Sequence, residues 1–335
     1  MSIAKITDYE KQYMEILSKI YYEGFSDGVN ERTGVATKRI TGVTMTLDVG
    51  KEFQILHSKK VAAITALREI EWIWKDMSNN VNDLKAHIWD AWADNNGSIG
   101  KSYGNQIDQP VCIYTDTKKR CADNFRAYEN QRDFVRQYLK EFPNGRQCTT
   151  TIWNPSQLAQ MNLVPCVHTC MWNLDGGRLN LTLCQRSGDF PVGVPFNTTQ
   201  YAQLMYMFAY ELGVEPGILT HTIADAHIYD RQMNGVSLQL KYYELMKEAV
   251  VMIQSGSDHK KIVDLAESIY ADKDRYEDEI PESHILVMNA KNAVTNNTEF
   301  LIHSEDRDMM SYRAEQCEIS NYSNVGSVTF GDIVV

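Results

Sequence analysis

The chain has 335 residues, 43% of them hydrophobic, so it can bury a sizeable core and does not need disulfide bonds to fold. Its 33 basic and 44 acidic side chains give a net charge of −11, which argues against a stable nucleic-acid partner and confines any phosphate site to a local arginine cluster. Seven cysteines, an odd number without a paired CxxC pattern, argue against a secreted disulfide scaffold or a zinc site and favour the reducing cytoplasm.

The first 76 residues are predicted to contain two helices separated by strands. Apolar side chains recur at helical spacing over residues 8–23, and Gly24 ends that pattern. Residues 40–49 alternate and are rich in β-branched side chains, which predicts strands. Residues 60–76 are predicted to form a rather apolar helix that Glu69 and Glu71 interrupt. At least one of these carboxylates is expected to face the interior, and such burial needs a reason.

The middle of the chain is predicted to hold a loop, a helix and a hairpin. Residues 78–106 are loop-like with aromatic anchors, and residues 121–141 are predicted to form a charged, exposed helix that stops at a proline turn. Residues 166–186 are predicted to form a β-hairpin around Gly176. If the turn is centred there, Cys166 and Arg186 face each other, with Cα atoms roughly 5 Å apart.

The rest of the chain is predicted to begin with a helix and to carry a peripheral segment. Residues 197–199 are expected to cap a helix that runs to Gly213, and residues 218–230 to form a buried strand. Residues 255–300 are polar with few periodic signals, so we expect a peripheral insertion rather than a second domain. There is no signal-peptide pattern and no apolar run of about 18 residues, so we expect neither export nor a membrane partner.

Cys166 is the candidate nucleophile. It follows a proline at the start of a strand, which fixes its backbone. The opposed Arg186 favours the thiolate, which is the reactive form. The alternative is that Cys166 is a small buried hydrophobe, like Cys170 and Cys184. The surrounding residues have to decide between these interpretations.

Several polar side chains fit a nucleotide, and each also has a plainer interpretation. The planar fork of Arg186 and the hydroxyl of Ser187 suit phosphate oxygens, although this motif could be a strand end in solvent. The Asn197 amide can donate and accept at once, as the edge of uracil requires, although it could be a helix N-cap. His227 and Tyr229 share one strand face, where they could bind a sugar hydroxyl or form an ordinary pair.

Read in order, a series of motifs resembles the thymidylate synthase family: ERTG, ILHSKK, REIEWIW, HIWDAWAD, GSIGKSYGNQ, VPC, QRSGDFPVGVPFN and HTIADAHIYD. The match covers most of residues 25–232, and the C-terminal third matches loosely apart from its ending, DIVV. The resemblance implies one catalytic domain over residues 1–335, with an α+β layered fold around a kinked mixed sheet, and an obligate homodimer. It also implies conversion of dUMP and 5,10-methylenetetrahydrofolate to dTMP and dihydrofolate without a metal.

The resemblance assigns roles to individual residues. Cys166 would add to carbon 6 of dUMP, Glu69 would organise proton transfers through water, Tyr103 would assist removal of the carbon 5 proton, and Asp189 and Asn197 would also serve catalysis. The groups that bind dUMP would be Arg32, Arg186 and Ser187 on the phosphate, with Arg146 given across the dimer, Asn197 on the uracil edge, and His227 and Tyr229 on the ribose 3′-hydroxyl. The folate site would be lined by Lys59, Trp89, Trp92, Asp189, Gly193 and Phe196, with Val335 closing over it.

The sequence departs from the family pattern at three places. Arg146 is followed by Gln147 where the family usually has a second arginine, so one phosphate contact is missing. Val167 follows Cys166 where histidine is common. The loosely matching tail bears on closure of the active site, which decides whether water reaches the methylene intermediate.

Three rival functions are distinguished by single features. A dUMP hydroxymethylase would add water to that same intermediate, whereas Trp89 and the apolar terminus can shield it and favour the synthase. A dCMP-specific enzyme would be better served by an acidic residue than by Asn197. A noncatalytic nucleotide- or RNA-binding relative would not need the nucleophile, the carboxylate and the tyrosine, and the net charge disfavours RNA. Trp89 and Trp92 also have a plainer interpretation as packing anchors.

Overall fold

The computed structural model describes residues 4–26, 28–30, 33–116, 118–256 and 259–331. Its central sheet has the spatial order β1 (Phe25–Ser26), β2 (Thr37–Asp48), β9 (Glu215–Tyr229), β7 (Arg178–Gln185), β6 (Val167–Asp175) and β5 (Thr149–Thr151). The short strand β8 (Gly188–Asp189) pairs with the end of β9. Strand β7 runs parallel to β9, and the other neighbours in that order are antiparallel. The predicted α+β fold around a mixed sheet is confirmed.

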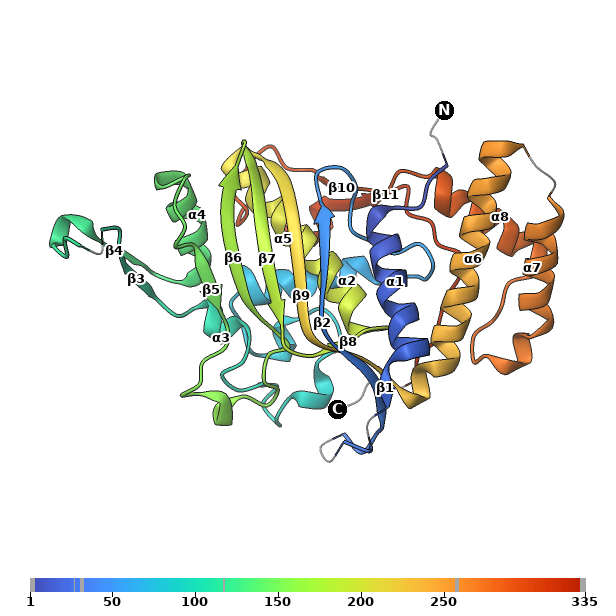
Figure 1. The fold of residues 1–335 in the computed structure, drawn as a ribbon. Helices are drawn as coiled ribbons and strands as arrows, with labels where there is room; N and C mark the ends of the chain where they lie inside the picture. The colour runs from blue at the N-terminus through green and yellow to red at the C-terminus, as the bar shows by residue number, and fades with distance from the viewer. Residues whose placement is uncertain (1–3, 27, 31–32, 117, 257–258, 332–335) are drawn as a thin grey trace.

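Helices cover one face of this sheet, and Figure 1 shows the other face of β6, β7 and β9 turned towards the viewer. Behind the sheet lie α2 (Ala63–Trp74) and α5 (Gly193–Leu212). The side chains of β7 alternate between the two faces, with Leu181 and Leu183 buried and Asn180 and Thr182 half-exposed. This alternation follows from the two-residue period of a strand. It leaves a polar sheet face that no helix of the described residues covers.

Smaller elements surround the core. The short helix α3 (Gly104–Ile107) and α4 (Gln131–Glu141) lie beside the sheet. Strands β3 (Val111–Tyr114) and β4 (Phe125–Tyr128) form a hairpin that projects from one end of the molecule in Figure 1. A second small sheet pairs β10 (Glu299–Ile302) with β11 (Cys317–Ser320).

The predicted elements at the N-terminal end are confirmed. Helix α1 (Asp8–Glu23) has the predicted bounds, and the Thr7 hydroxyl caps it by accepting from the Glu10 N–H. Helix α2 lies within the predicted range, and both of its carboxylates, Glu69 and Glu71, are buried. The burial of Glu71 has a structural reason, since it accepts from the Lys75 ammonium at 2.8 Å and from a backbone N–H at 2.9 Å.

The predicted hairpin is present, and it brings Cys166 opposite Arg186 by an unexpected route. Gly176 and Gly177 both have positive φ, at 55° and 78°, as a two-residue turn requires, so the centre lies between them and not on Gly176. Centring the turn half a residue later would by itself shift the strand pairing, so that Arg186 would no longer lie opposite Cys166. A β-bulge around His168 restores the pairing and bends the strand.

Helix α5 begins earlier than predicted. Its first residue is Gly193, so Asn197 lies inside the helix and is not its N-cap. Pro195 is compatible with this start because a proline in the first turn loses no helical hydrogen bond. The helix ends as predicted at Gly213, whose φ of 69° is left-handed. Strands β2 and β9 also confirm the predicted strands.

The prediction of an exposed helix over residues 121–141 is wrong in its first half and in its exposure. Residues 122–124 form a single 3-10 turn, residues 125–128 form strand β4, and only the later part is α-helical. Arg132 and Asp133 are buried, paired with each other at 3.2 Å, and Arg132 also donates to the Lys75 carbonyl at 3.0 Å. Their charges suggested a solvent-exposed face, but an ion pair with satisfied hydrogen bonds can be buried.

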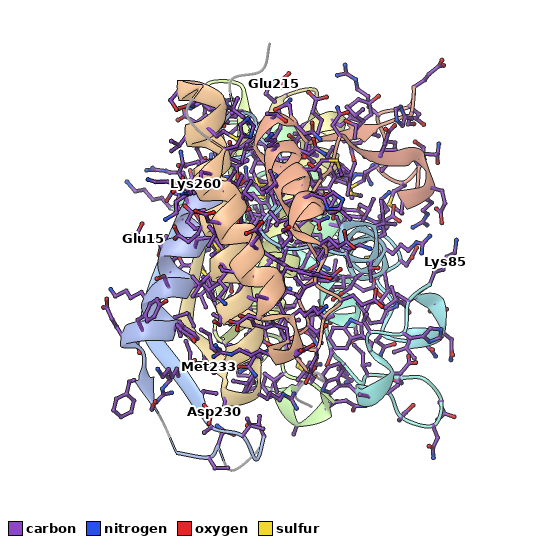
Figure 2. The ribbon with its side chains drawn as sticks, turned by 90° about the vertical axis from the view of Figure 1, so that its right-hand side faces the viewer. Glu15, Lys85, Glu215, Asp230, Met233 and Lys260 are labelled. Carbon is purple, nitrogen blue, oxygen red and sulfur yellow. The ribbon has the colours of Figure 1, made fainter. Side chains whose placement is uncertain are left out.

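The residues after β9 form a helical layer with its own apolar cluster. Helices α6 (Met233–Ser255), α7 (Lys260–Ala271) and α8 (Ser283–Thr295) pack around side chains that include Leu245 and Ile269. Figure 2 faces this layer and labels the first residues of α6 and α7. The sequence analysis predicts neither α7 nor α8, because each buries only a narrow apolar stripe. None of the helices in the described ranges is long and apolar enough to cross a bilayer.

Candidate active site

One cavity of about 480 Å³ collects most of the predicted site residues. Its walls come from α2, the loop before α3, the open ends of β6 and β7, the segment from β8 into α5, and the end of β9. Segments far apart in the sequence therefore meet at one place. The predicted residues that line the cavity are Glu69, Trp89, Trp92, Tyr103, Cys166, Arg186, Ser187, Asp189, Gly193, Phe196, Asn197, His227 and Tyr229.

Two predicted residues lie elsewhere. Lys59 is buried behind the cavity wall, where its ammonium donates to the Pro191 carbonyl and burial lowers its pKa to about 8. Arg146 lines a separate hollow together with Gln147. It is not one of the residues that line the cavity described above. Arg32 and Val335 lie outside the described residues.

The Cys166 backbone is held by Arg186. Cys166 directly precedes β6 and Arg186 directly follows β7. The Arg186 N–H donates to the Cys166 carbonyl at 2.9 Å, which confirms the predicted juxtaposition. The guanidinium donates to the carbonyls of Pro165 at 2.9 Å and Val164 at 2.8 Å. The arginine therefore braces the segment that presents the thiol to the cavity.

The other cysteines differ from Cys166 in their surroundings. Cys166 is partly exposed, and it is the cysteine that lines the cavity in the described part of the chain. Burial raises the pKa of the Cys148 and Cys170 thiols, so both stay protonated and inert. Cys184 is only half-buried. Within the described ranges, no three His, Cys, Asp or Glu side chains are placed to hold a metal ion.

Glu69 projects from α2 into the cavity and is 6% exposed. Burial raises the pKa of its carboxyl to about 7, while hydrogen bonds from Trp89 and Gln200 act in the opposite direction. A carboxyl with a pKa near 7 can both give and accept a proton at neutral pH. The sequence analysis missed Gln200, although it lies one helical turn after Asn197 and therefore on the same side of α5.

Tyr103 has a strained backbone beside Cys166. Its φ is 43° and its ψ is −101°, a conformation that non-glycine residues rarely adopt. The phenol oxygen accepts from the Cys166 N–H at 3.4 Å, and the ring packs edge-on against Trp89 at 4.8 Å. Burial raises the pKa of the phenol far above its ordinary value, so the hydroxyl keeps its proton. Strain of this kind is typical of residues that a functional site holds in place.

Two glutamines that the sequence analysis missed form hydrogen bonds with the side chains of Asp189 and Asn197. Gln232 donates to both carboxylate oxygens of Asp189 at 3.0 Å. Burial nevertheless raises the pKa of Asp189 above its ordinary value. Gln185 donates to Oδ1 of Asn197 at 3.3 Å. Gln185 directly precedes Arg186 and is the first residue of the motif QRSGDFPVGVPFN. This position was the sequence signal that could have identified it as a site residue.

A second, polar cavity of about 620 Å³ adjoins the first and shares Arg186, Ser187, His227 and Tyr229 with it. Nδ1 of His227 lies 2.8 Å from Asp225, whose other oxygen lies 3.0 Å from the Arg39 guanidinium. The bond with His227, together with the charge of Arg39, holds the pKa of Asp225 below its ordinary value.

Asp225 and Arg39 were both missed by the sequence analysis. Asp225 could have been found, because it lies two residues before His227 on the same strand face. Arg39 faces His227 only through the register of β2 with β9, for which the sequence carried no signal.

Comparisons with known proteins agree on one family. The family model described as thymidylate synthase matches residues 11–279. The thymidylate synthase of Clostridium beijerinckii is 38% identical over 235 residues, covering 69% of this chain and 81% of that protein. That of Bacillus licheniformis is 36% identical over 247 residues, covering 70% and 85%.

The solved structure of a thermostable thymidylate synthase A from Bacillus subtilis has the same fold. It matches with a TM-score of 0.71 and 28% identity, covering 96% of this chain and 98% of that one. The sequence motifs, the fold and these relatives agree, and the chain belongs to the thymidylate synthase family.

Proposed function

We propose that this chain methylates dUMP with 5,10-methylenetetrahydrofolate, giving dTMP and dihydrofolate, and that Cys166 is the nucleophile. Membership of the family makes the chain a thymidylate synthase. The observation that carries the residue assignment is the meeting of Cys166, Glu69, Tyr103 and Asn197 around one cavity. Each chemical role in the reaction then has a suitable group within that cavity.

The nucleotide is proposed to lie across the two adjoining cavities, with its base beside Cys166. Arg186 and Ser187 line both cavities, so a phosphate at their junction would receive charge-assisted hydrogen bonds. His227 and Tyr229 also line both, which suits a sugar hydroxyl between base and phosphate. The amide of Asn197 would read the carbonyl and N–H on the uracil edge.

The proposed chemistry starts when Sγ of Cys166 forms a bond to carbon 6 of uracil and the displaced electron pair moves towards O4. Carbon 5 thereby becomes a nucleophile. Asn197 would stabilise the charge on O4. Glu69, with a pKa of about 7, would give and take protons through water. Because the Tyr103 phenol keeps its own proton, Tyr103 would help to remove the proton from carbon 5 by a hydrogen bond to the water that accepts it, and would not be the base itself. At the end, Sγ leaves carbon 6 and the ring double bond forms again.

The cavity also fits a folate, which supplies the methylene carbon and the hydride that reduces it. A flat heterocycle can stack on an aromatic and apolar wall made by Ile88, Trp89, Trp92, Leu163, Val192 and Phe196. The Asp189 carboxylate lies in the same cavity and can accept hydrogen bonds from ring N–H groups.

The dUMP hydroxymethylase alternative depends on access of water to the methylene. Trp89 is 6% exposed and packs against Trp72 at 5.9 Å and Trp92 at 5.4 Å, so this wall is closed by aromatic rings. Purified protein given dUMP and methylenetetrahydrofolate is expected to produce dihydrofolate, seen as an absorbance rise, and dTMP by mass analysis. A product of hydroxymethyl mass without dihydrofolate would reverse the assignment.

We also propose a homodimer that buries the open sheet face. That face carries partly exposed side chains such as Met171, Asn180 and Thr182, and Figure 1 shows no helix of this chain across it. Arg146 is proposed to bind the phosphate in the partner's site, since it lines a hollow apart from its own chain's cavity.

Mixed dimers are expected to test the role of Arg146. The variants Cys166→Ala and Arg146→Glu should each be almost inactive as homodimers. After unfolding and refolding a 1:1 mixture, half of the dimers are mixed, and each has one site with a native Cys166 and a native Arg146 from the other chain. Activity should therefore return to about a quarter of the wild-type value. No gain on mixing would place Arg146 outside the partner's site.

The remaining proposals concern organisation and location. We propose a single catalytic domain in which the segment around residues 255–300 is a peripheral insertion. Among the residues described as lining the two cavities, none comes from this segment. The seven cysteines, an odd number without a paired CxxC pattern, support a reducing, cytoplasmic location, and the net charge of −11 disfavours a nucleic-acid partner.

A further inference from the structure

A chain of buried polar side chains leads from the core to Asn197. His221 is fully buried on β9, and its Nε2 lies 2.8 Å from Oε1 of Gln185. Its Nδ1 lies 3.1 Å from the Thr198 hydroxyl. Gln185, which is 3% exposed, donates through Nε2 to the Ser187 carbonyl at 2.8 Å and to Oδ1 of Asn197 at 3.3 Å. We call this set, Thr198, His221, Gln185 and Asn197, the polar relay.

The direction of the hydrogen bonds that Gln185 makes in the polar relay follows from one backbone group. The Ser187 carbonyl can only accept, so the nitrogen of the Gln185 amide must face it and the oxygen must face His221. Nε2 of His221 then has to carry the ring proton. Burial lowers the pKa of His221 to about 3, so the ring is neutral and Nδ1 carries no proton. The single proton of the Thr198 hydroxyl then has two acceptors, Nδ1 of His221 at 3.1 Å and the Val194 carbonyl at 2.8 Å.

The last link sets the orientation of Asn197. Both N–H groups of Gln185 are used, one on Ser187 and one on Asn197. Oδ1 of Asn197 therefore faces Gln185, and its Nδ2 is available to the cavity that it lines. A flipped Asn197 amide would put two N–H donors against each other, which costs a buried hydrogen bond.

We propose that His221 is a positioning residue that selects uracil over cytosine by holding Gln185, and through it the Asn197 amide, in one orientation. Uracil presents a carbonyl at carbon 4 and an N–H at position 3, which matches an amide that donates through Nδ2 and accepts through Oδ1. Cytosine presents the reverse pattern and needs the flipped amide. This inference rests on the proposed function, in which Asn197 reads the base.

The test compares dCMP with dUMP in variants of His221. Leu at this position keeps the volume but removes the donor to Gln185, so His221→Leu is expected to raise the ratio of kcat/KM for dCMP over dUMP at least about tenfold. His221→Gln retains a donor and should return the ratio to within about threefold of the wild type. Release of tritium from carbon 5 of each labelled nucleotide measures both reactions.

Two further variants calibrate the measurement. Leu219→Val alters a buried residue on the same strand and face without touching the polar relay, and it should leave the ratio unchanged. Asn197→Asp, which changes the base-reading group itself, should shift the ratio towards dCMP more than His221→Leu does. The inference is overturned if His221→Leu leaves the ratio at the wild-type value, or if Leu219→Val shifts it equally.

A wild-type measurement covers the case in which His221→Leu does not fold. Neutron diffraction of the protein with dUMP should place a deuteron on Nε2 of His221 and the Asn197 nitrogen opposite the carbon 4 carbonyl. A deuteron on Nδ1 alone, or the reverse amide orientation, would overturn the inference. Failure of the proposed function is seen separately, as a wild-type protein that releases no tritium from dUMP.

Discussion

Replacing Cys166 with serine is expected to lower kcat for dTMP formation by at least about 1,000-fold while dUMP still binds. A serine hydroxyl is a much weaker nucleophile than a thiolate, so the bond to carbon 6 would not form at a useful rate. The groups proposed to hold the phosphate and the sugar, Arg186, Ser187, His227 and Tyr229, are unchanged. Dihydrofolate absorbance measures turnover, and calorimetric titration measures binding of dUMP.

The same substitution at Cys112 is the matched control. Cys112 is exposed on β3 and lies outside the cavity, so Cys112→Ser should keep nearly wild-type activity. If Cys166→Ser kept turnover within a few-fold of the wild type, a different group would have to be the nucleophile. If dUMP binding were lost together with turnover, the effect would be structural and would not identify a nucleophile.

Glu69→Gln is expected to lower kcat by about 10²- to 10⁴-fold, because the amide cannot carry a proton between water and substrate. The amide keeps the size of the carboxyl and can still form hydrogen bonds with Trp89 and Gln200. The affinity for dUMP should therefore change little, and the loss should appear in kcat. A variant with unchanged kcat would remove Glu69 from the proton-transfer path.

The same variant is expected to be more stable than the wild type above pH 7. Burial raises the pKa of Glu69 from 4.5 to about 7, so between these values the folded chain keeps a proton that the unfolded chain releases. The wild type therefore loses stability as pH rises from 4.5 to 7. Because glutamine does not ionise, Glu69→Gln should gain about 3 kcal/mol in the free energy of unfolding above pH 7, and nothing below pH 4.5.

Glu71→Gln on the same helix provides the opposite expectation. Glu71 is also buried, but it pairs with the buried Lys75 ammonium at 2.8 Å. Its replacement leaves that charge without a counter-ion, so the variant should lose about 3 kcal/mol of stability. Urea unfolding at pH 4 and pH 8 distinguishes the two variants. Equal effects of both substitutions at pH 8 would contradict the assignment of Glu69 as a buried, unpaired acid.

The amino-acid sequence by itself determined several of the elements and many of the chemical groups that line the cavity. Helix α1 followed from its 3.6-residue apolar spacing, and the hairpin from two adjacent glycines, which can both adopt the positive φ of its turn. The order of the motifs identified the family, and the resemblance assigned Cys166 as the proposed nucleophile. These features are encoded locally, because backbone preferences and short motifs depend on neighbouring residues only.

Only the tertiary structure decided the burial, the pKa and the hydrogen-bond partners of those groups. The sequence presented Glu69 and Glu71 as equivalent interruptions of one helix, and their difference comes from Lys75 beside one and the apolar cavity wall around the other. The link from His221 to Asn197 and the place of Arg39 depend on strand register. The physical reason is that burial and hydrogen-bond partners come from segments far apart in the chain, whose contacts no local pattern records.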